Sequence, residues 1–392
     1  MGIDEAMGSI PDGARVLIGS GCGVPRRLAA ALAEAHQRWH RLDIVAGYLF
    51  EPLDLFAHTG SPFIITSLHP TPALRGVDPA HLRTVPLRYG DLPLALGPGG
   101  VHAPDAVLVQ VSPPDRDGRC SLGVSVGGLV DAVRTAPLVI AQVNASAPYV
   151  YGDGELDRDD VDLFVSADTP LVGMGDGSPT PVVDAIAAHV AGEISDGATV
   201  QIGVGRVPDA VLAALEHHRG LRLHGGMFTS GCRRLVEVGA VERVCVAAEV
   251  MGDAELFAWV DRNPAVRTVS ARTSHGLATL LALPRFVAIN SALEVDLAGA
   301  VNGEFGDDGR LVSGPGGLPD FVNAALASAD GTSVIALPAR SADGERRRIV
   351  ASLDGRVTLP AFLADRVVTD RGVARLRGRS LPERRLALQA IA

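Results

Sequence analysis

One motif occurs twice in the sequence, as IPDGARVLIGSG at residues 10–21 and as ISDGATVQIGVG at residues 194–205. In each copy an Asp-Gly-Ala turn leads into a short apolar strand, and the strand ends in Gly-x-Gly. A proline follows, Pro25 in the first copy and Pro208 in the second, and an Ala/Leu-rich helix begins there. The repeat predicts two similar α/β domains, which we place at residues 1–180 and 181–392.

Apolar segments alternate with helical ones through both halves. The segments expected to form buried strands are 106–111, 137–143, 163–165, 244–250, 286–289 and 333–337. Strands that alternate with helices favour open, mostly parallel sheets. A Gly/Pro/Ser-rich segment at 172–181 is the expected linker, and an amphipathic helix over 183–194 opens the second domain.

Composition narrows the class of protein. The chain has 392 residues, of which 47% are hydrophobic and 4% aromatic, so its core is built mainly from Ala, Val and Leu. A net charge of −10 argues against a nucleic-acid partner, which requires a basic face. The sequence contains no lysine, because all 35 basic residues are arginine. Schiff-base chemistry and the lysines of P-loops and kinases are therefore excluded.

Cysteine usage and hydropathy predict a reduced, cytoplasmic protein. Cys22, Cys120, Cys232 and Cys245 form no CxxC pair, so no zinc ribbon and no bound metal are expected. Residues 1–19 lack the apolar core of a signal peptide. No uncharged apolar stretch approaches the roughly 18 residues of a membrane span, so no membrane association is expected.

Three glycine-containing motifs stand out. GVGRVP at 203–208 is not a dinucleotide fingerprint, since Pro208 replaces the third glycine, yet the start of a helix there offers N–H groups to an anion or a carbonyl. GPGG at 314–317 lets a backbone approach a ligand closely, as an oxyanion hole requires. GVSVG at 123–127 fits the G-x-S-x-G pattern, but a turn cluster precedes it instead of a strand, which disfavours a nucleophile elbow.

Longer strings carry a family resemblance. They are VSPPDRDGRCSLGVS at 111–125, QIGVGRVPDA at 201–210, AINSALEVDL at 288–297, VN at 301–302 and SGPGGLPDF at 313–321. Together they resemble the acetyl-CoA hydrolase/transferase family of the class I CoA-transferase superfamily, which includes 4-hydroxybutyrate and succinyl-CoA:acetate CoA-transferases. The resemblance runs in the family's order from about residue 10 past residue 321.

The resemblance implies two similar CoA-transferase-type α/β domains with mostly parallel sheets, and an acyl-CoA substrate with a second small molecule as acceptor. In such enzymes a glutamate attacks the thioester, and an acyl-glutamyl anhydride and a glutamyl-CoA thioester follow. The resemblance further implies a homo-oligomer, most simply a dimer, and no metal. The implied site residues are Gly316 and Gly317 for the oxyanion and Gly203, Val204, Gly205, Asn302 and Gly314 for CoA.

One departure from the family matters most. The family's His-Thr-Glu-Met segment corresponds here to His224, Gly225, Gly226 and Met227, so Gly226 occupies the position of the catalytic glutamate. A family asparagine downstream falls near Ser274 and His275. Loss of a covalent nucleophile can cost a factor on the order of 10⁶ in turnover, by analogy with protease variants.

We therefore expect an enzyme that hydrolyses an acyl-CoA or passes its acyl group directly to a non-carboxylate acceptor. His224 or His275 would act as the base, and the glycine loop would hold the oxyanion. Three alternatives stay open. Glu249 could supply another carboxylate for a conventional CoA-transferase, Cys232 could act as a thiolate, or the chain could bind CoA without turnover.

Overall fold

The chain folds into two compact units in a computed structural model that describes residues 2–56, 62–175 and 179–392. Unit 1 comprises Met1–Met174 and Ala247–Thr273, and unit 2 comprises Gly175–Val246 and Ser274–Ala392. Residues 247–273 thus return to unit 1 after the chain has entered unit 2. The predicted domains, 1–180 and 181–392, do not include this return, and their limits stay a prediction. Part of the expected linker, residues 176–178, lies outside the described residues.

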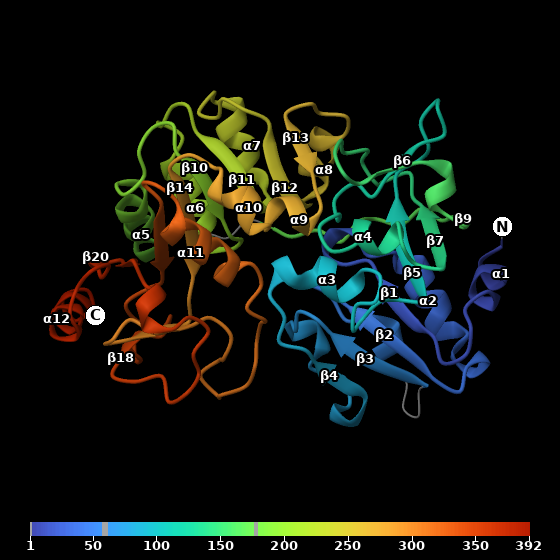
Figure 1. Ribbon diagram of the computed structural model, residues 1–392, viewed down its shortest axis with the longest axis horizontal. Coiled ribbons are helices and arrows are strands. Elements are labelled where there is room, and N and C mark those ends of the chain that lie inside the picture. Colours follow the sequence, from blue (N-terminus) through green and yellow to red (C-terminus); the bar gives the residue numbers. More distant parts are fainter. Residues whose placement is uncertain (1, 57–61, 176–178) are drawn as a thin grey trace. The chain divides into compact units, whose positions relative to one another are not determined.

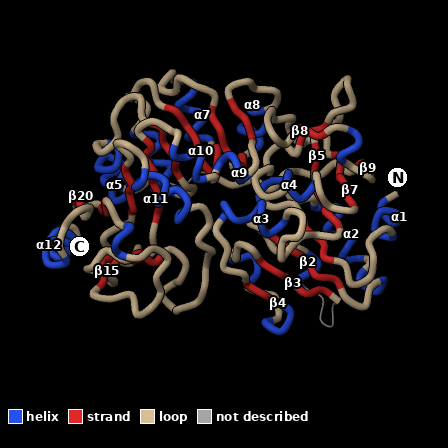
Figure 2. The backbone as a smooth tube through the Cα atoms, in the orientation of Figure 1, coloured by secondary structure: helices blue, strands red, loops and turns tan. Residues whose placement is uncertain are grey.

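Unit 1 is built on a parallel sheet in the order β4-β3-β2-β1-β5-β7-β9. Figures 1 and 2 show β2, β3 and β4 as neighbouring strands. The strands are β1 (Arg15–Ile18), β2 (Leu42–Ala46), β3 (Phe63–Ser67), β4 (Leu82–Thr84), β5 (Ala106–Val111), β7 (Leu138–Val143) and β9 (Leu163–Ser166). The helices are α1 (Ile3–Gly8), α2 (Arg26–Glu34), α3 (Leu92–Leu96), α4 (Val130–Val133) and α8 (Ala254–Val260).

Both faces of this sheet are buried, as its apolar sequence requires. Val16 and Ile18 of β1 contribute to one hydrophobic core, and Leu17 between them contributes to a second. Successive strand residues point to opposite faces, so the alternation places one core on each side of the sheet. Strand β5 is buried at every position, which is typical of a parallel sheet covered on both faces.

Strands β12 (Cys245–Val250) and β13 (Val266–Thr268) lie late in the chain, yet residues 247–273 belong to unit 1. Backbone hydrogen bonds explain this assignment: the N–H of Val250 donates to the carbonyl of Val124 at 2.8 Å, and the N–H of Gly127 donates to Ala248 at 3.0 Å. A short ladder of β6 (Cys120–Ser121) and β8 (Glu155–Leu156) completes the strands of this unit.

Unit 2 repeats the parallel arrangement. Its sheet runs β11-β10-β14-β17-β19, and β20 pairs antiparallel with β19. The strands are β10 (Thr199–Ile202), β11 (Arg222–Phe228), β14 (Phe286–Ser291), β17 (Thr332–Ala336), β19 (Arg366–Thr369) and β20 (Gly372–Arg375). The helices are α5 (Pro181–Ala191), α6 (Arg206–Ala214), α7 (Ser230–Glu237), α10 (Leu277–Leu281), α11 (Leu318–Ala327) and α12 (Leu381–Ala390), and α9 (Ala271–Ser274) ends at its boundary. A small sheet joins β15 (Glu294–Asp296) to β16 (Val301–Asn302) and β18 (Ile349–Val350).

The predicted fold class and the six predicted strands are confirmed. The sequence repeat is also a structural repeat: Gly21 has φ +60° and Gly205 has φ +115°, so the last glycine of the Gly-x-Gly in each copy takes a positive φ that other residues rarely adopt. In each unit the repeat strand lies at the point where strand order reverses, β1 between β2 and β5, and β10 between β11 and β14. Open α/β sheets bind ligands at the carboxyl ends of strands at such points.

Among the described helices, none combines the length and the apolar character that crossing a bilayer requires.

Candidate active site

Two strand ends in unit 2 bring buried polar side chains together. Gln201 near the end of β10 and Asn290 near the end of β14 exchange amide hydrogen bonds, at 3.4 Å from Gln201 Nε2 and 3.2 Å from Asn290 Nδ2. Both residues are buried. Because the two buried amides satisfy each other's hydrogen-bonding groups, they form a stable polar pair at the point where the strand order reverses.

His224 and His275, the two histidines predicted as bases, lie at this end of unit 2. Nε2 of His224 lies 3.2 Å from the carbonyl oxygen of Ser274, and Nδ1 of His275 lies 2.9 Å from Oγ of Ser274. The ring of His275 packs on Phe321 with 4.5 Å between the centroids. Burial first, and the nearby His224 second, lower the pKa of His275 to about 3. The imidazole is therefore neutral at physiological pH.

Gly226 faces His275. A Cβ atom at Gly226 would lie 3.6 Å from both Cε1 and Nε2 of that ring, which is an ordinary van der Waals distance. Gly226 is not among the residues with positive φ, so its backbone accepts a side chain. Because strand residues two apart share a face, Gly226 lies on the same face of β11 as His224. Neither the backbone conformation nor the immediate neighbours require glycine here.

The predicted oxyanion loop reaches the same imidazole. Gly316 has φ +53°, and Gly317 is the N-cap of α11. A Cβ atom at Gly317 would lie 2.5 Å from Nε2 of His275 and 2.7 Å from a ring carbon of Phe321, so this position has no room for a side chain. The structure thus brings His275, Gly226 and Gly317 together from three distant segments of the chain.

The residues predicted to bind CoA lie in two places in unit 2. Gly203, Val204 and Gly205 join β10 to α6, and Gly205 is the N-cap of that helix. Asn302 is buried and donates to Oε2 of Glu294 at 3.1 Å and to the carbonyl of Phe305 at 2.8 Å. Its side chain therefore stabilises the local turn. The CoA-binding role of these residues and of Gly314 stays a prediction.

Cys232 lies in the first turn of α7 and is fully buried. The hydroxyl of Thr229 lies 3.8 Å from its Sγ. Burial raises the pKa of the Cys232 thiol, which opposes formation of a thiolate. The structure gives the thiolate alternative no physical support, and the role of Cys232 stays a prediction.

Glu249 belongs to unit 1, where it faces the first copy of the repeat. It is 4% exposed, and its Oε1 accepts a hydrogen bond from the hydroxyl of Tyr89 at 2.8 Å. Among the described residues, no group hydrogen-bonds its Oε2. Burial raises the pKa of Glu249 to about 7, while the nearby hydroxyl groups of Tyr89 and Ser125 act against that rise. A carboxyl group of this kind exchanges protons near neutral pH, as acid–base groups do.

Sequence reasoning missed the partners of Glu249. Tyr89 lies 160 residues away in the chain, and Ser125 pairs with Glu249 through an isolated antiparallel bridge. The G-x-S-x-G match concerns Ser125 as a nucleophile and does not predict that it lies beside Glu249. No local pattern connects residues that only the packing of β12 brings together. No cluster of three or more potential metal ligands occurs among the residues that the structure describes.

Comparison with known proteins defines the class. The acetyl-CoA hydrolase/transferase N-terminal domain matches residues 79–205, and the C-terminal domain of the same family matches residues 252–392. The chain therefore belongs to the acetyl-CoA hydrolase/transferase family and is an enzyme of acyl-CoA transferase/hydrolase type.

Individual relatives agree with this assignment. The chain is 37% identical to the 4-hydroxybutyrate coenzyme A transferase of Clostridium kluyveri over 74% of this chain and 69% of the relative. It is 31% identical to the succinyl-CoA:acetate/propanoyl-CoA:succinate CoA transferase of Fasciola hepatica over 99% and 84%. Among solved structures, RipA from Yersinia pestis superimposes with a TM-score of 0.91 at 27% identity, covering 100% of this chain and 93% of RipA. A 4-hydroxybutyrate CoA-transferase from Porphyromonas gingivalis gives 0.84 at 29% identity with the same coverage.

Proposed function

We propose that the protein hydrolyses an acyl-CoA, or passes its acyl group to a non-carboxylate acceptor, without a glutamyl intermediate. The single observation that carries the proposal is the meeting of Gly226, His275 and Gly317. Gly226, which by resemblance takes the place of the family's catalytic glutamate, has no side chain. It faces the neutral imidazole of His275, which lies beside the glycine loop.

The chemistry of direct attack suits these groups. With Nδ1 of His275 protonated and donating to Ser274 Oγ, Nε2 is the basic nitrogen of the ring, and it lies 3.6 Å from the position of a Cβ atom at Gly226. An acceptor O–H can hydrogen-bond to that nitrogen while its oxygen attacks the thioester carbon. A C–O bond forms, the C–S bond breaks, and the acceptor proton passes through His275 to the departing CoA thiolate. The low pKa of His275 lets it take the proton only after the attack has made that proton acidic.

The glycine loop supplies the second requirement. Attack on the thioester places negative charge on the carbonyl oxygen, and the closeness of Gly317 to His275 supports the oxyanion role predicted for Gly316 and Gly317. In the first turn of α11, Pro319 has no N–H, and the N–H groups of Leu318 and Phe321 donate to the carbonyls of Pro315 and Gly317. Because the sequence lacks lysine, the CoA phosphates must be met by arginine, by helix N-termini or by solvent.

The experiment is a thiol-release assay over a panel of acyl-CoAs, with water, alcohols, amines and carboxylates as acceptors. A parallel sample is treated with borohydride under turnover and mapped by mass spectrometry. We expect CoA release without any reduced glutamyl adduct. An adduct on a glutamate would refute direct attack, and tight CoA binding without thioester loss would leave a non-catalytic binding protein.

One observation favours a second function, that of a conventional CoA-transferase that uses Glu249. Its carboxyl group has a pKa near 7, and no described residue hydrogen-bonds its Oε2. In this case the borohydride adduct maps to the peptide containing Glu249, and turnover requires a carboxylate acceptor. Replacement by Gln then abolishes transfer, whereas direct attack at His275 survives it.

A homodimer and a cytoplasmic location are part of the same proposal and rest on the resemblance to the family. Sedimentation of the full chain tests the first, and fractionation of cells that express it tests the second.

A further inference from the structure

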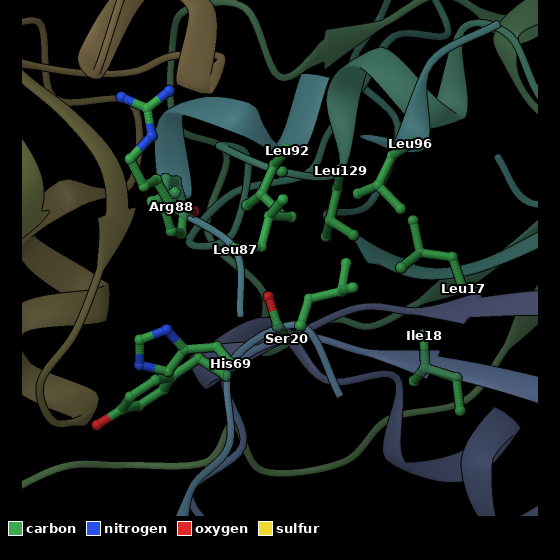
Figure 3. A pocket seen from close by; sticks show the side chains of 14 residues that line it. Leu17, Ile18, Ser20, His69, Leu87, Arg88, Leu92, Leu96 and Leu129 are labelled. Atoms are coloured by element: carbon green, nitrogen blue, oxygen red, sulfur yellow. The ribbon is translucent and has the colours of Figure 1, made fainter. Parts of the chain in front are cut away.

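Two pockets of different chemistry lie at the carboxyl edge of the unit 1 sheet. The one in Figure 3 follows β1, β2 and β3, and leucine side chains such as Leu17, Leu92 and Leu129 form much of its wall. The other follows β5, β7 and β9, has a volume of about 600 Å³, and includes residues of α8 in its wall. The return of residues 247–273 to unit 1 therefore completes this second pocket.

Much of the lining of the second pocket is apolar and rigid. Its larger apolar residues are Pro113, Pro114, Pro148, Pro170, Leu171 and Phe257. Proline and aromatic walls of this kind suit an apolar side chain, because they offer buried area and lose little conformational freedom when a ligand packs against them.

Two opposite charges, those of Asp261 and Arg262, follow α8 directly and also line this pocket. Among the described residues, neither of them forms an ion pair, with the other or with a third group. Tyr149, the other ionisable group of the described lining, stays neutral, because burial raises its pKa and its hydrogen bond to Glu155 raises it further. Two unpaired charges of opposite sign in one pocket complement a ligand that carries both signs.

Backbone hydrogen bonds hold both charged residues in place beside Tyr149. Oδ1 of Asp261 accepts from the N–H of Tyr149 at 2.7 Å, and the N–H of Arg262 donates to the carbonyl of Tyr149 at 2.8 Å. Arg262 has φ +51°, a left-handed conformation that is unfavourable for a residue with a side chain and that this hydrogen bonding maintains. Its guanidinium carbon lies 4.3 Å from the centroid of the Tyr149 ring. Charged groups that are ordered in advance lose less entropy when a ligand binds.

We propose that this pocket binds a free α-amino acid with an aliphatic side chain, with its carboxylate on Arg262, its ammonium group on Asp261 and its side chain against Phe257 and the prolines. A guanidinium matches a planar carboxylate with two parallel N–H donors. Asp261 uses Oδ1 for the N–H of Tyr149 and has Oδ2 for the ammonium group. The two residues are consecutive, with about 3.8 Å between their Cα atoms, which suits a ligand whose two charges are attached to one carbon.

The test is a ligand-observed NMR titration of the full chain at pH 7, without acyl-CoA, with three probes of related shape. They are L-leucine, 4-methylpentanoate, which lacks the ammonium group, and 3-methylbutylamine, which lacks the carboxylate. An ion pair between exposed groups changes affinity by up to about fivefold. We therefore expect leucine to bind about threefold to fivefold more tightly than either probe with a single charge.

Two variants separate the charges. Asp261→Asn keeps an oxygen that accepts from the N–H of Tyr149 and removes the negative charge. Leucine should then lose its advantage over 4-methylpentanoate and keep its advantage over 3-methylbutylamine. Arg262→Gln should have the opposite effect. Arg116→Gln is the matched control, because Arg116 is an exposed arginine near this pocket that does not line it, and it should change neither advantage.

Three results would overturn the inference. If leucine binds no more tightly than either probe with a single charge, the assigned ligand class is wrong. If no probe binds saturably, the pocket has no such ligand. If the full preference for leucine persists in Asp261→Asn and in Arg262→Gln, the amino acid binds elsewhere. Because no thioester is present and neither residue has a part in the proposed reaction, these outcomes are independent of the proposed function.

Discussion

Nε2 of His275 lies 2.5 Å from the position that a Cβ atom of Gly317 would occupy, so the imidazole ring rests directly on the backbone of the glycine loop. The same nitrogen lies 3.6 Å from the position of a Cβ atom at Gly226. A single ring therefore contacts both the loop that would hold an oxyanion and the position that lacks the expected carboxylate. The two glycines therefore differ in the space available: a Cβ atom fits at Gly226 and does not fit at Gly317.

Gly226→Glu should convert the chemistry. The backbone conformation and the 3.6 Å spacing permit a Cβ atom at Gly226, on the side that faces His275. We expect a borohydride-reducible adduct on this glutamate, and transfer of CoA to acetate at least about tenfold above background. Acyl-CoA turnover with acetate as acceptor, followed by peptide mapping, measures both.

Gly226→Gln is the matched control, because it fills the same space without a nucleophile. It should give no adduct and should lower direct turnover by obstructing the acceptor. If Gln and Glu behave alike, the position has no catalytic significance and the assignment of Gly226 is mistaken.

Gly317→Ala should impair turnover by displacing His275. The added methyl group would lie 2.5 Å from Nε2 of His275 and 2.7 Å from Phe321, so the ring or the loop must move. We expect at least a tenfold loss of turnover, as small displacements of catalytic groups produce. Gly192→Ala places its methyl group at an ordinary 3.6 Å from backbone oxygens and should leave turnover within about twofold. Equal turnover rates for Gly317→Ala and Gly192→Ala would show that turnover does not depend on the position of the His275 imidazole.

Acid should destabilise the protein partly through His275. Its pKa is about 3 in the folded chain and near 6.5 in an unfolded one, so the unfolded state binds more protons between these values. The free energy of unfolding should fall as the pH is lowered through that window, by up to about 1.4 kcal/mol per pH unit. Urea denaturation at pH 7 and pH 4.5 measures this slope. His275→Asn should flatten it, and the exposed His217→Asn should not; an unchanged slope in both variants contradicts the prediction.

Glu249 should have the opposite effect. Its pKa is about 7 in the folded chain against 4.5 for an ordinary glutamate, so the folded state retains a proton that the unfolded state has lost. The stability it contributes is present below pH 4.5 and is lost as the pH rises to about 7. Glu249→Gln should therefore gain stability over the natural chain at pH 8 relative to pH 5, on the order of 3 kcal/mol.

Chemical denaturation at the two pH values measures this difference, and the exposed Glu242→Gln serves as the control. Between pH 4.5 and 6.5, His275 and Glu249 change the free energy of unfolding in opposite directions. The effect of each residue is therefore obtained by comparing the natural chain with the variant at that residue. If the stability of Glu249→Gln depends on pH in the same way as that of the natural chain, the group that titrates is not Glu249.

Cys232 should react slowly with iodoacetamide at pH 8, because burial both raises its thiol pKa and excludes the reagent. Mass spectrometry of the native and urea-unfolded chain compares the rates. Rapid modification of the native chain, with loss of turnover, would support the thiolate alternative.

The repeated strand–Gly-x-Gly–helix unit, the α/β class and the six predicted strands could all be inferred from the sequence, because these depend on short-range hydrophobic pattern and on glycine's conformational freedom. Gly21 and Gly205 show this most directly, since both have the positive φ that their place in the repeat demands. The sequence also predicts that Gly226 takes the place of the family's catalytic glutamate, because residues on either side of it resemble the family's segment.

Which side chains contact one another could not be inferred from the sequence and is seen only in the folded chain. The contact of His275 with Gly226 and Gly317, and the hydrogen bond from Tyr89 to Glu249, join segments far apart in the chain. The return of residues 247–273 to unit 1 is equally invisible in local sequence. Such contacts follow from strand order and from packing across a sheet, which local hydrophobic pattern does not encode. The pKa values of His275 and Glu249 follow from the same packing, because burial is their largest cause.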